Sequence, residues 1–117
     1  MDFVAEAPSS AIARFERIFH ELGQSGEEVA VAKMYGIICI KAGGKAIGGL
    51  DLDGAMVFKL APDDREAALA LAGARVFDPT GKRPMKAWVV VPATHANFWE
   101  VFARQALDYR FPQPRPS

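Results

Sequence analysis

Apolar residues recur at helical spacing near the start of the sequence, while most charged residues between them fall elsewhere on the helical wheel. The apolar stripe consists of Ile12, Phe15, Ile18, Phe19 and Leu22. Ser9 or Ser10 can cap this helix. Gly23 is placed to end it in a left-handed turn, because glycine has no Cβ to penalise that conformation. The pattern predicts a first helix over about residues 11–22.

From residue 28 to residue 60 the pattern changes to short β-rich runs. The runs read EVAVAKMYGIICIKA, KAIGGLDL and AMVFKL. Gly43-Gly44 and Asp53-Gly54 separate them and supply the positive φ angles that tight hairpin turns require. The pattern therefore predicts an antiparallel meander of three strands. Gly36, and the Gly48-Gly49 pair, lie inside these runs and indicate a bulge or the close approach of another backbone.

Two further helices are predicted in the second half of the sequence. Pro62 suits the first turn of a short helix, Asp63 and Asp64 complement its positive end, and Gly73 follows its alanine- and leucine-rich body. Thr94 can cap the last helix. The apolar stripe of that helix is predicted to contain Phe98, Val101, Phe102, Ala106 and Tyr109.

Between these two helices, residues 75–78 and 85–91 have strand patterns and flank a turn at 79–82. The order is thus a helix, three strands, a helix, two strands and a helix, which predicts a two-layer α/β (α+β) protein with a mainly antiparallel sheet. Residues 37–40 and 89–91 are apolar without alternation, so we expect these strands to be covered on both faces. Because three helices do not supply two full covers, we expect a second copy of the chain or a flexible segment to cover the remainder.

Composition favours one globular domain. The chain has 117 residues, of which half are hydrophobic and about a quarter charged. We expect a single domain over residues 9–111, with flexible tails at 1–8 and 112–117, since the proline-rich sequence FPQPRPS cannot continue a helix.

The charge balance excludes a global attraction to nucleic acid or to an anionic membrane. Fourteen Lys and Arg residues balance fourteen Asp and Glu residues. The start, MDFVAEAPSS, has acids where a signal peptide needs cations, and no apolar run reaches the length of a membrane span. These features lead us to expect a cytoplasmic protein with no membrane partner.

Five short motifs stand in an order and spacing typical of a known family. They are Lys33-Met34-Tyr35-Gly36, Gly43-Gly44, Asp53-Gly54, Pro62-Asp63-Asp64 and Arg83-Pro84-Met85-Lys86-Ala87-Trp88. Together they resemble the N-terminal domain of the TfoX (Sxy) competence-regulator family, over about residues 14–109. The resemblance implies the two-layer fold and a link to the regulation of DNA uptake or transcription.

TfoX regulators carry a second, C-terminal domain, and this sequence has a proline-rich segment in its place. We therefore expect a stand-alone domain of similar fold with a partner of its own. The leading hypothesis is a non-catalytic interaction module, forming a homodimer that acts through a protein partner.

No residues form a recognisable catalytic or metal-binding pattern. His20 is predicted near the end of the first helix, and His95 in the first turn of the last helix beside its capping residue. Cys39 is the only cysteine and lies in the apolar run IICI, so we expect a buried, unreactive side chain. Asp51 and Asp53 lack the further oxygen ligands of a calcium loop and indicate a hairpin instead. We expect no enzyme activity, no metal and no cofactor.

One candidate binding group combines cations with an aromatic residue. Its members are Arg75, Lys82, Arg83, Lys86 and Trp88. They could offer phosphate contacts and a stacking surface to a small anion or to nucleic acid. If Trp88 is buried, however, Lys86 lies at the rim of a solvated hairpin edge, and charged edges of this kind also discourage aggregation. We favour this second interpretation.

A second candidate group surrounds the first glycine of the meander. Its members are Lys33, Met34, Tyr35 and Gly36. Methionine and tyrosine are enriched at partner interfaces, so the group could line a ligand groove or an interaction surface. The alternative, which we favour, is core packing beneath the first helix.

Overall fold

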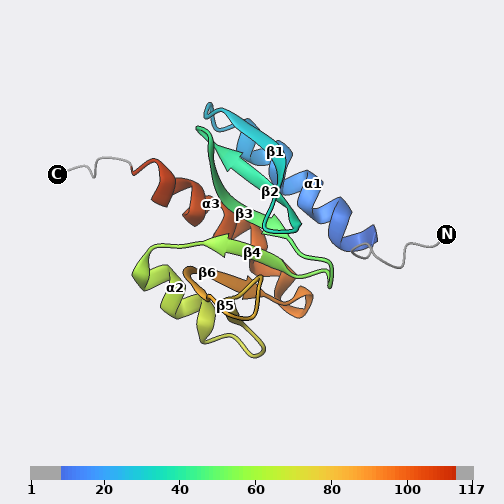
Figure 1. The fold of residues 1–117 in the computed structure, drawn as a ribbon. Helices are drawn as coiled ribbons and strands as arrows, with labels where there is room; N and C mark the ends of the chain where they lie inside the picture. Colours follow the sequence, from blue (N-terminus) through green and yellow to red (C-terminus); the bar gives the residue numbers. More distant parts are fainter. Residues whose placement is uncertain (1–8, 113–117) are drawn as a thin grey trace.

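The computed structural model describes residues 9–112, so the tails expected at 1–8 and 112–117 lie outside the described residues, apart from Pro112. Three α-helices, a 3₁₀ helix and six strands make an α+β protein, which confirms the predicted class. The elements are α1 (Ser9–Gly23), β1 (Val29–Met34), β2 (Ile37–Ala42), β3 (Lys45–Leu50), β4 (Met56–Lys59), α2 (Pro62–Leu69), β5 (Arg75–Phe77), β6 (Met85–Val91), η1 (Ala93–Phe98) and α3 (Trp99–Arg110). The strands form one antiparallel sheet in the order β1-β2-β3-β4-β6-β5 (Figure 1).

Four strands, not three, precede α2. The run predicted as one strand over residues 28–42 breaks at Tyr35 and Gly36, which form a tight turn with φ angles of 55° and 78°. Both angles are positive, as in the hairpin turn whose twist matches that of the flanking strands. A tyrosine rarely adopts this conformation, because its Cβ crowds the backbone. The bulge or close approach expected at Gly36 is therefore wrong.

The other glycine predictions hold in the meander. Gly43 and Gly44 have φ angles of 58° and 85°, and Gly54 has 90°, as hairpin turns require. A close approach of backbone occurs at Gly49, where a Cβ atom would lie 2.8 Å from the carbonyl oxygen of Ile38. Glycine at this position lets β2 and β3 pack without a clash.

The end of α1 differs from the prediction. The left-handed conformation expected at Gly23 occurs at Gly26, in the loop before β1, where φ is 94°. The hydroxyl of Ser25 donates a hydrogen bond of 2.6 Å to the carbonyl of Leu22. This bond satisfies one of the carbonyls that the helix end leaves without an intrahelical donor, so no left-handed Gly23 is needed.

The last helix starts later than predicted. Thr94 makes no capping bond, because residues 93–98 form the 3₁₀ helix η1 after Pro92, and α3 begins at Trp99. The indole N–H of Trp99 donates to the carbonyl of Val91 at 3.2 Å and fixes the rotation of the helix. The buried face consists of Trp99, Phe102, Ala103, Ala106 and Leu107. Three members of the predicted stripe are exposed, namely Phe98, Val101 and Tyr109.

Helices α1 and α3 cover one face of the sheet, and α2 packs beside β6 (Figure 1). The core on this face joins the apolar side chains of the helices to alternate residues of the central strands. Its strand residues are Ile40, Ala42, Ile47, Leu50, Met56, Phe58, Val89 and Val91. Burial of this apolar surface is the main favourable contribution to folding.

The opposite face has a smaller core built from strands and their connections. Its buried members are Ile37, Cys39, Ala46, Ala55, Val57, Phe77, Trp88 and Val90. The ring of Tyr35, at the β1–β2 turn, contacts Phe77 of β5 and Trp88 of β6, although two or more strands separate β2 from them. The sheet must therefore curve until its two ends approach each other over this face.

This curvature leaves less of the doubly apolar strands to be covered by a second copy of the chain or a flexible segment, and that cover stays a prediction. Residues Val89, Val90 and Val91 are buried on both faces, as predicted, but by the chain itself. The apolar residues of β2 are also buried by the chain itself, with the exception of Ile38, which is 42% exposed.

Within residues 9–112, every helix is too short or too polar to cross a membrane.

Candidate functional site

The predicted cationic group lacks an accessible aromatic surface. Trp88 is 4% exposed and packs between Phe77, at a ring distance of 6.3 Å, and Tyr35, at 5.9 Å. Its indole cannot stack on a base without unpacking this core. Arg75, Lys82, Arg83 and Lys86 are all exposed. Binding of an anion or nucleic acid by these four cations remains a prediction. The buried Trp88 cannot add the stacking contact that this prediction included.

The loop that carries two of these cations is organised around an acid. Asp78 accepts hydrogen bonds through Oδ1 from the N–H groups of Gly81, at 2.8 Å, and Arg83, at 3.3 Å. The N–H of Lys82 donates to the hydroxyl of Thr80 at 3.2 Å. A carboxylate thus lies in the same loop as these cations and reduces the local positive potential.

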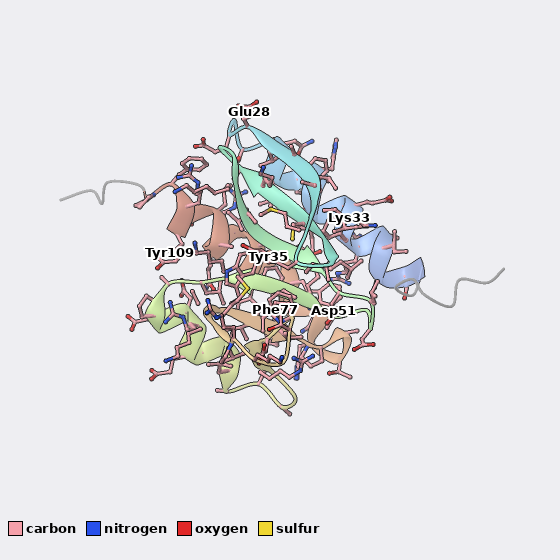
Figure 2. All side chains as sticks on the ribbon, viewed as in Figure 1. Glu28, Lys33, Tyr35, Asp51, Phe77 and Tyr109 are labelled. Atoms are coloured by element: carbon pink, nitrogen blue, oxygen red, sulfur yellow. The ribbon has the colours of Figure 1, made fainter. Side chains whose placement is uncertain are left out.

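The second predicted group lies beside the first. Lys33 and Met34 end β1, and the turn at Tyr35 and Gly36 lies over the smaller core (Figure 2). Met34 packs against that core, on the sheet face away from α1. Core packing is correct for Met34, but its expected place beneath the first helix is wrong, because β1 alternation directs Met34 to the other face.

Sequence reasoning missed an apolar groove between α1 and the β1 end of the sheet. The groove has a volume of about 330 Å³ and is lined by Ile12, Phe15, Glu16, Phe19, Val31, Ile38 and Leu50. Val31 is 48% exposed and Ile38 is 42% exposed. In the sequence, the apolar run of β2 without alternation predicts that both faces of this strand are covered. Ile38 is nevertheless exposed within the described residues, and this mismatch is the sign of an open apolar surface.

The outer edge of β1 borders this groove. Within the described residues β1 pairs only with β2, in a register from Val29↔Ala42 to Met34↔Ile37. The N–H of Gly43 donates to the carbonyl of Glu28 at 3.1 Å, so even-numbered residues direct their backbone groups toward β2. The backbone groups of Val29, Val31 and Lys33 therefore point outward from the sheet.

This edge carries little of the protection that exposed strands usually have. Proline, bulges and several charges normally prevent a strand edge from pairing with another chain. Strand β1 reads VAVAKM, with Lys33 as its one charged residue and no proline. Its register with β2 is continuous. The edge and the groove together form a surface suited to β-strand addition, which we call the β1 surface.

The ionisable residues considered for catalysis have structural surroundings. Burial raises the pKa of the Cys39 thiol from 9.0 to about 11. The thiol also donates a hydrogen bond to the Met34 carbonyl at 3.7 Å. His95 donates through Nε2 to the carbonyl of Ala72 at 2.8 Å, and His20 hydrogen-bonds with Gln24 at 3.2 Å.

Asp51 shapes the turn between β3 and β4. Its Oδ1 accepts hydrogen bonds from the N–H groups of Asp53, at 2.9 Å, and Ala55, at 3.0 Å, which confirms the predicted hairpin. Over residues 9–112, no three His, Cys, Asp or Glu side chains come together in a group that could hold a metal ion.

Neither family models, nor curated proteins, nor solved structures gave a match to this chain. The resemblance to the TfoX N-terminal domain therefore stays a prediction from its motifs.

Proposed function

We propose that the protein is a non-catalytic interaction module that forms a homodimer through the β1 surface. The observation that carries the proposal is the outer edge of β1, which no strand of residues 9–112 pairs with. This edge directs the backbone groups of Val29, Val31 and Lys33 outward beside an apolar groove. Strand addition satisfies such backbone groups and buries the neighbouring side chains at the same time.

A second copy of the chain is a suitable occupant because β1 is self-complementary. A two-fold axis makes the two strands antiparallel. With the axis at Ala30, the outward backbone groups of Val29 meet those of Val31 in the second copy, as an antiparallel ladder requires. Glu28 and Lys33 lie at opposite ends of β1 (Figure 2). The two acids that precede β1 in one copy, Glu27 and Glu28, then lie alongside Lys33 of the other.

The groove adds apolar contact to this pairing. Val31 pairs with Ile40, a residue of the core under the helices, so Val31 faces the side of the sheet that carries α1. In the dimer, the valines of the second β1 reach the same face, next to Val31 and the exposed Ile38. Burial of these side chains supplies the hydrophobic contribution that strand pairing alone lacks.

The motifs shared with TfoX N-terminal domains support a regulatory role for this module, in transcription or competence, through a further protein partner. The surroundings of Cys39, His20 and His95 support a non-catalytic role, since each side chain is buried or held by a hydrogen bond.

Native mass spectrometry and size-exclusion chromatography with light scattering test the proposal. We expect the wild-type protein to be a dimer at micromolar concentration and Val31→Lys to be a monomer, because the substitution places a charge on each side of the paired edge. Val101→Lys is the matched control: Val101 is 52% exposed, but lies on the outer side of α3. This variant should remain a dimer.

Circular dichroism of each variant shows whether the fold is retained. A wild-type protein that stays monomeric up to hundreds of micromolar contradicts the proposal. So does an equal loss of dimer in Val31→Lys and Val101→Lys, because the interface would then not be specific to β1.

A further inference from the structure

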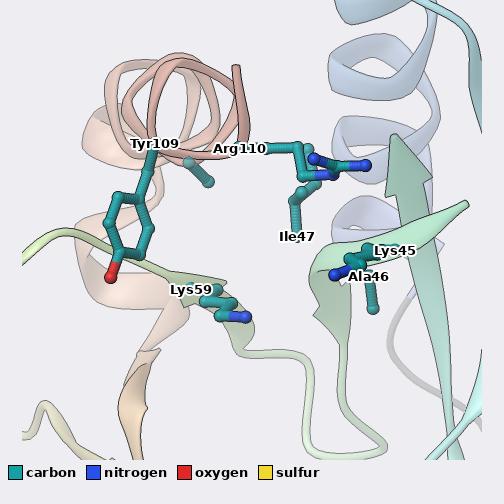
Figure 3. A pocket seen from close by; sticks show the side chains of 7 residues that line it. Lys45, Ala46, Ile47, Lys59, Tyr109 and Arg110 are labelled. Atoms are coloured by element: carbon teal, nitrogen blue, oxygen red, sulfur yellow. The ribbon is translucent and has the colours of Figure 1, made fainter. Parts of the chain in front are cut away.

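Strands β3 and β4 separate at one end and leave an opening in the sheet. Their pairing runs from Leu50↔Met56 to Gly48↔Phe58 and goes no further, whereas Lys59 continues to pair with Trp88 of β6. The first three residues of β3 thus have no partner in β4. The opening has a volume of about 200 Å³ and is lined by Lys45, Ala46, Ile47, Lys59, Ala106, Tyr109 and Arg110 (Figure 3).

Three of the lining residues are cations and none is acidic. They reach the opening from different elements, Lys45 from the start of β3, Lys59 from the end of β4 and Arg110 from the last turn of α3. Within residues 9–112 none of them forms an ion pair with an acid, and Arg14 with Glu100 is the pair found there. Bringing three like charges together without a counter-charge is unfavourable, so an anion bound between them would be stabilised.

Arg110 is held in place by the backbone. Its Nε donates to the carbonyl of Ala42 at 3.0 Å, and its Nη2 donates to the carbonyl of Gly43 at 2.9 Å. Its guanidinium carbon also lies 4.6 Å from the centre of the Phe111 ring. Figure 3 shows the side chain extending from α3 toward the start of β3, where Lys45 lies. Its guanidinium charge is therefore fixed before a ligand arrives, which lowers the entropic cost of binding.

The remaining walls are apolar or aromatic. Ala46, Ile47 and Ala106 form part of the lining, and the ring of Tyr109 descends from α3 toward Lys59 (Figure 3). The phenol hydroxyl of Tyr109 is a further hydrogen-bond donor. A ligand of this opening would thus have an anionic group for the cations and a small organic part for the walls. A volume below the usual range of about 300–1,000 Å³ for drug-sized ligands favours a small molecule.

We propose that the opening between β3, β4 and α3 is a binding site for a phosphate group, carried by a small phosphomonoester. Phosphate oxygens accept charge-assisted hydrogen bonds from lysine and arginine, which are stronger than bonds between neutral groups. This site is separate from the β1 surface, because none of its lining residues lies on α1 or β1. It is also distinct from the cations at 75–86.

Titration with phosphate, followed by ¹H–¹⁵N NMR, tests the site. Inorganic phosphate and phenyl phosphate are the probes, and phenol is the control without an anionic group. We expect saturable shifts confined to residues 45–47, 59 and 106–110. Lys45→Gln and Lys59→Gln should each weaken phosphate binding by about tenfold, because each removes one charge-assisted contact. Lys82→Gln, in the exposed β5–β6 loop, should bind as the wild type does.

Two outcomes identify the source of the phosphate group. Tighter binding of phenyl phosphate than of inorganic phosphate supports a phosphomonoester. Equal affinity overturns the phosphomonoester and indicates free phosphate at the same site. The absence of saturable shifts, or an equal loss of affinity in Lys82→Gln, overturns the proposal. The same titration on the Val31→Lys variant separates this proposal from the proposed function, because a monomer with an intact opening should still bind phosphate.

Discussion

The ring of Tyr35 lies 5.9 Å from that of Trp88, at an interplanar angle of 70°. This edge-to-face contact joins the β1–β2 turn to β6 over the face of the sheet that carries the smaller core. Tyr35 makes a second such contact with Phe77, at 6.5 Å and 79°. Two aromatic contacts offset the strain of a tyrosine at a φ angle of 55°.

Replacing Tyr35 with alanine should destabilise the protein by about 1–3 kcal/mol, because each of the two aromatic contacts contributes about 0.5–1.5 kcal/mol. Alanine carries the same Cβ, so the strain of the positive φ remains and the loss reports the ring contacts. Tyr109→Ala is the control, since its exposure of 40% resembles the 44% of Tyr35. Urea denaturation should show a change within about 0.5 kcal/mol for this control. Equal losses in both variants would show that the ring contacts contribute little.

Gly49→Ala should reduce the free energy of unfolding by about 1–3 kcal/mol through overpacking. The added Cβ would lie 2.8 Å from the carbonyl oxygen of Ile38 and 2.9 Å from Ile37 Cδ1. Gly23→Ala provides the contrast. The nearest atom to its added Cβ is Val29 Cγ2 at 3.5 Å, and Gly23 has no positive φ. Alanine should stabilise the helix end there by a few tenths of a kcal/mol to about 1 kcal/mol. Changes of the same sign in thermal denaturation would contradict this account.

Asp51→Ala should cost about 1–3 kcal/mol of stability. The substitution leaves the N–H groups of Asp53 and Ala55 without the Oδ1 acceptor in a partly buried turn. Asp51→Asn keeps an acceptor oxygen and should lose less. The exposed Asp53, changed to alanine, serves as the neighbouring control and should change stability by less than about 0.5 kcal/mol. If Asp51→Asn proved as harmful as Asp51→Ala in chemical denaturation, the charge and not the acceptor would be responsible.

Cys39 should resist thiol reagents in the folded protein. With its pKa raised to about 11 by burial, the thiol is almost wholly protonated near pH 8, and the thiolate is the reactive form. We expect modification by a disulfide reagent to be slow in buffer and fast in denaturant. Rapid modification of the folded protein at neutral pH would show that β2 opens readily.

The same pKa shift makes stability depend on pH in a definite direction. The thiol titrates near 9.0 in the unfolded chain and near 11 in the folded protein. Below pH 9 it is protonated in both states, and its contribution to stability is complete. Between about pH 9 and 11 the unfolded chain ionises first, so this contribution is lost as pH rises. The stability difference between the wild type and Cys39→Ala should therefore shift against the wild type over this range, measured by urea denaturation at each pH.

Elements with strong local patterns could be predicted from the sequence. The stripe of α1, the valines of β6 and the glycine turns at 43–44 and 54 all lie where expected, because periodicity and positive φ are local properties. Tyr35 is the exception. Hairpin turns of this type usually contain asparagine or aspartate, and the tyrosine is explained only by its distant contacts with Phe77 and Trp88.

The rotation of α3 and the phosphate site also depend on distant contacts. Trp99 sets the buried face of α3 through its bond to Val91, which shifts the stripe away from the predicted residues. Lys45, Lys59 and Arg110 are far apart in the sequence and meet only because β3 and β4 separate beneath the end of α3. The cations near residue 82 are close together in the sequence and were therefore easy to recognise. Closeness in the sequence does not, however, place side chains around a cavity.

The strand order has a consequence for how the chain folds. Every neighbouring pair of strands is consecutive in sequence except β4 and β6, which meet only after α2 and β5 have been traversed. Hairpins close quickly because their loops are short, whereas the β4–β6 junction closes a longer loop and forms more slowly. In a nascent chain that has completed its first four strands, the edge of β4 that later pairs with β6 is therefore still unpaired. Val57 and Phe58, at the centre of the finished sheet, are then the residues through which such an intermediate would aggregate.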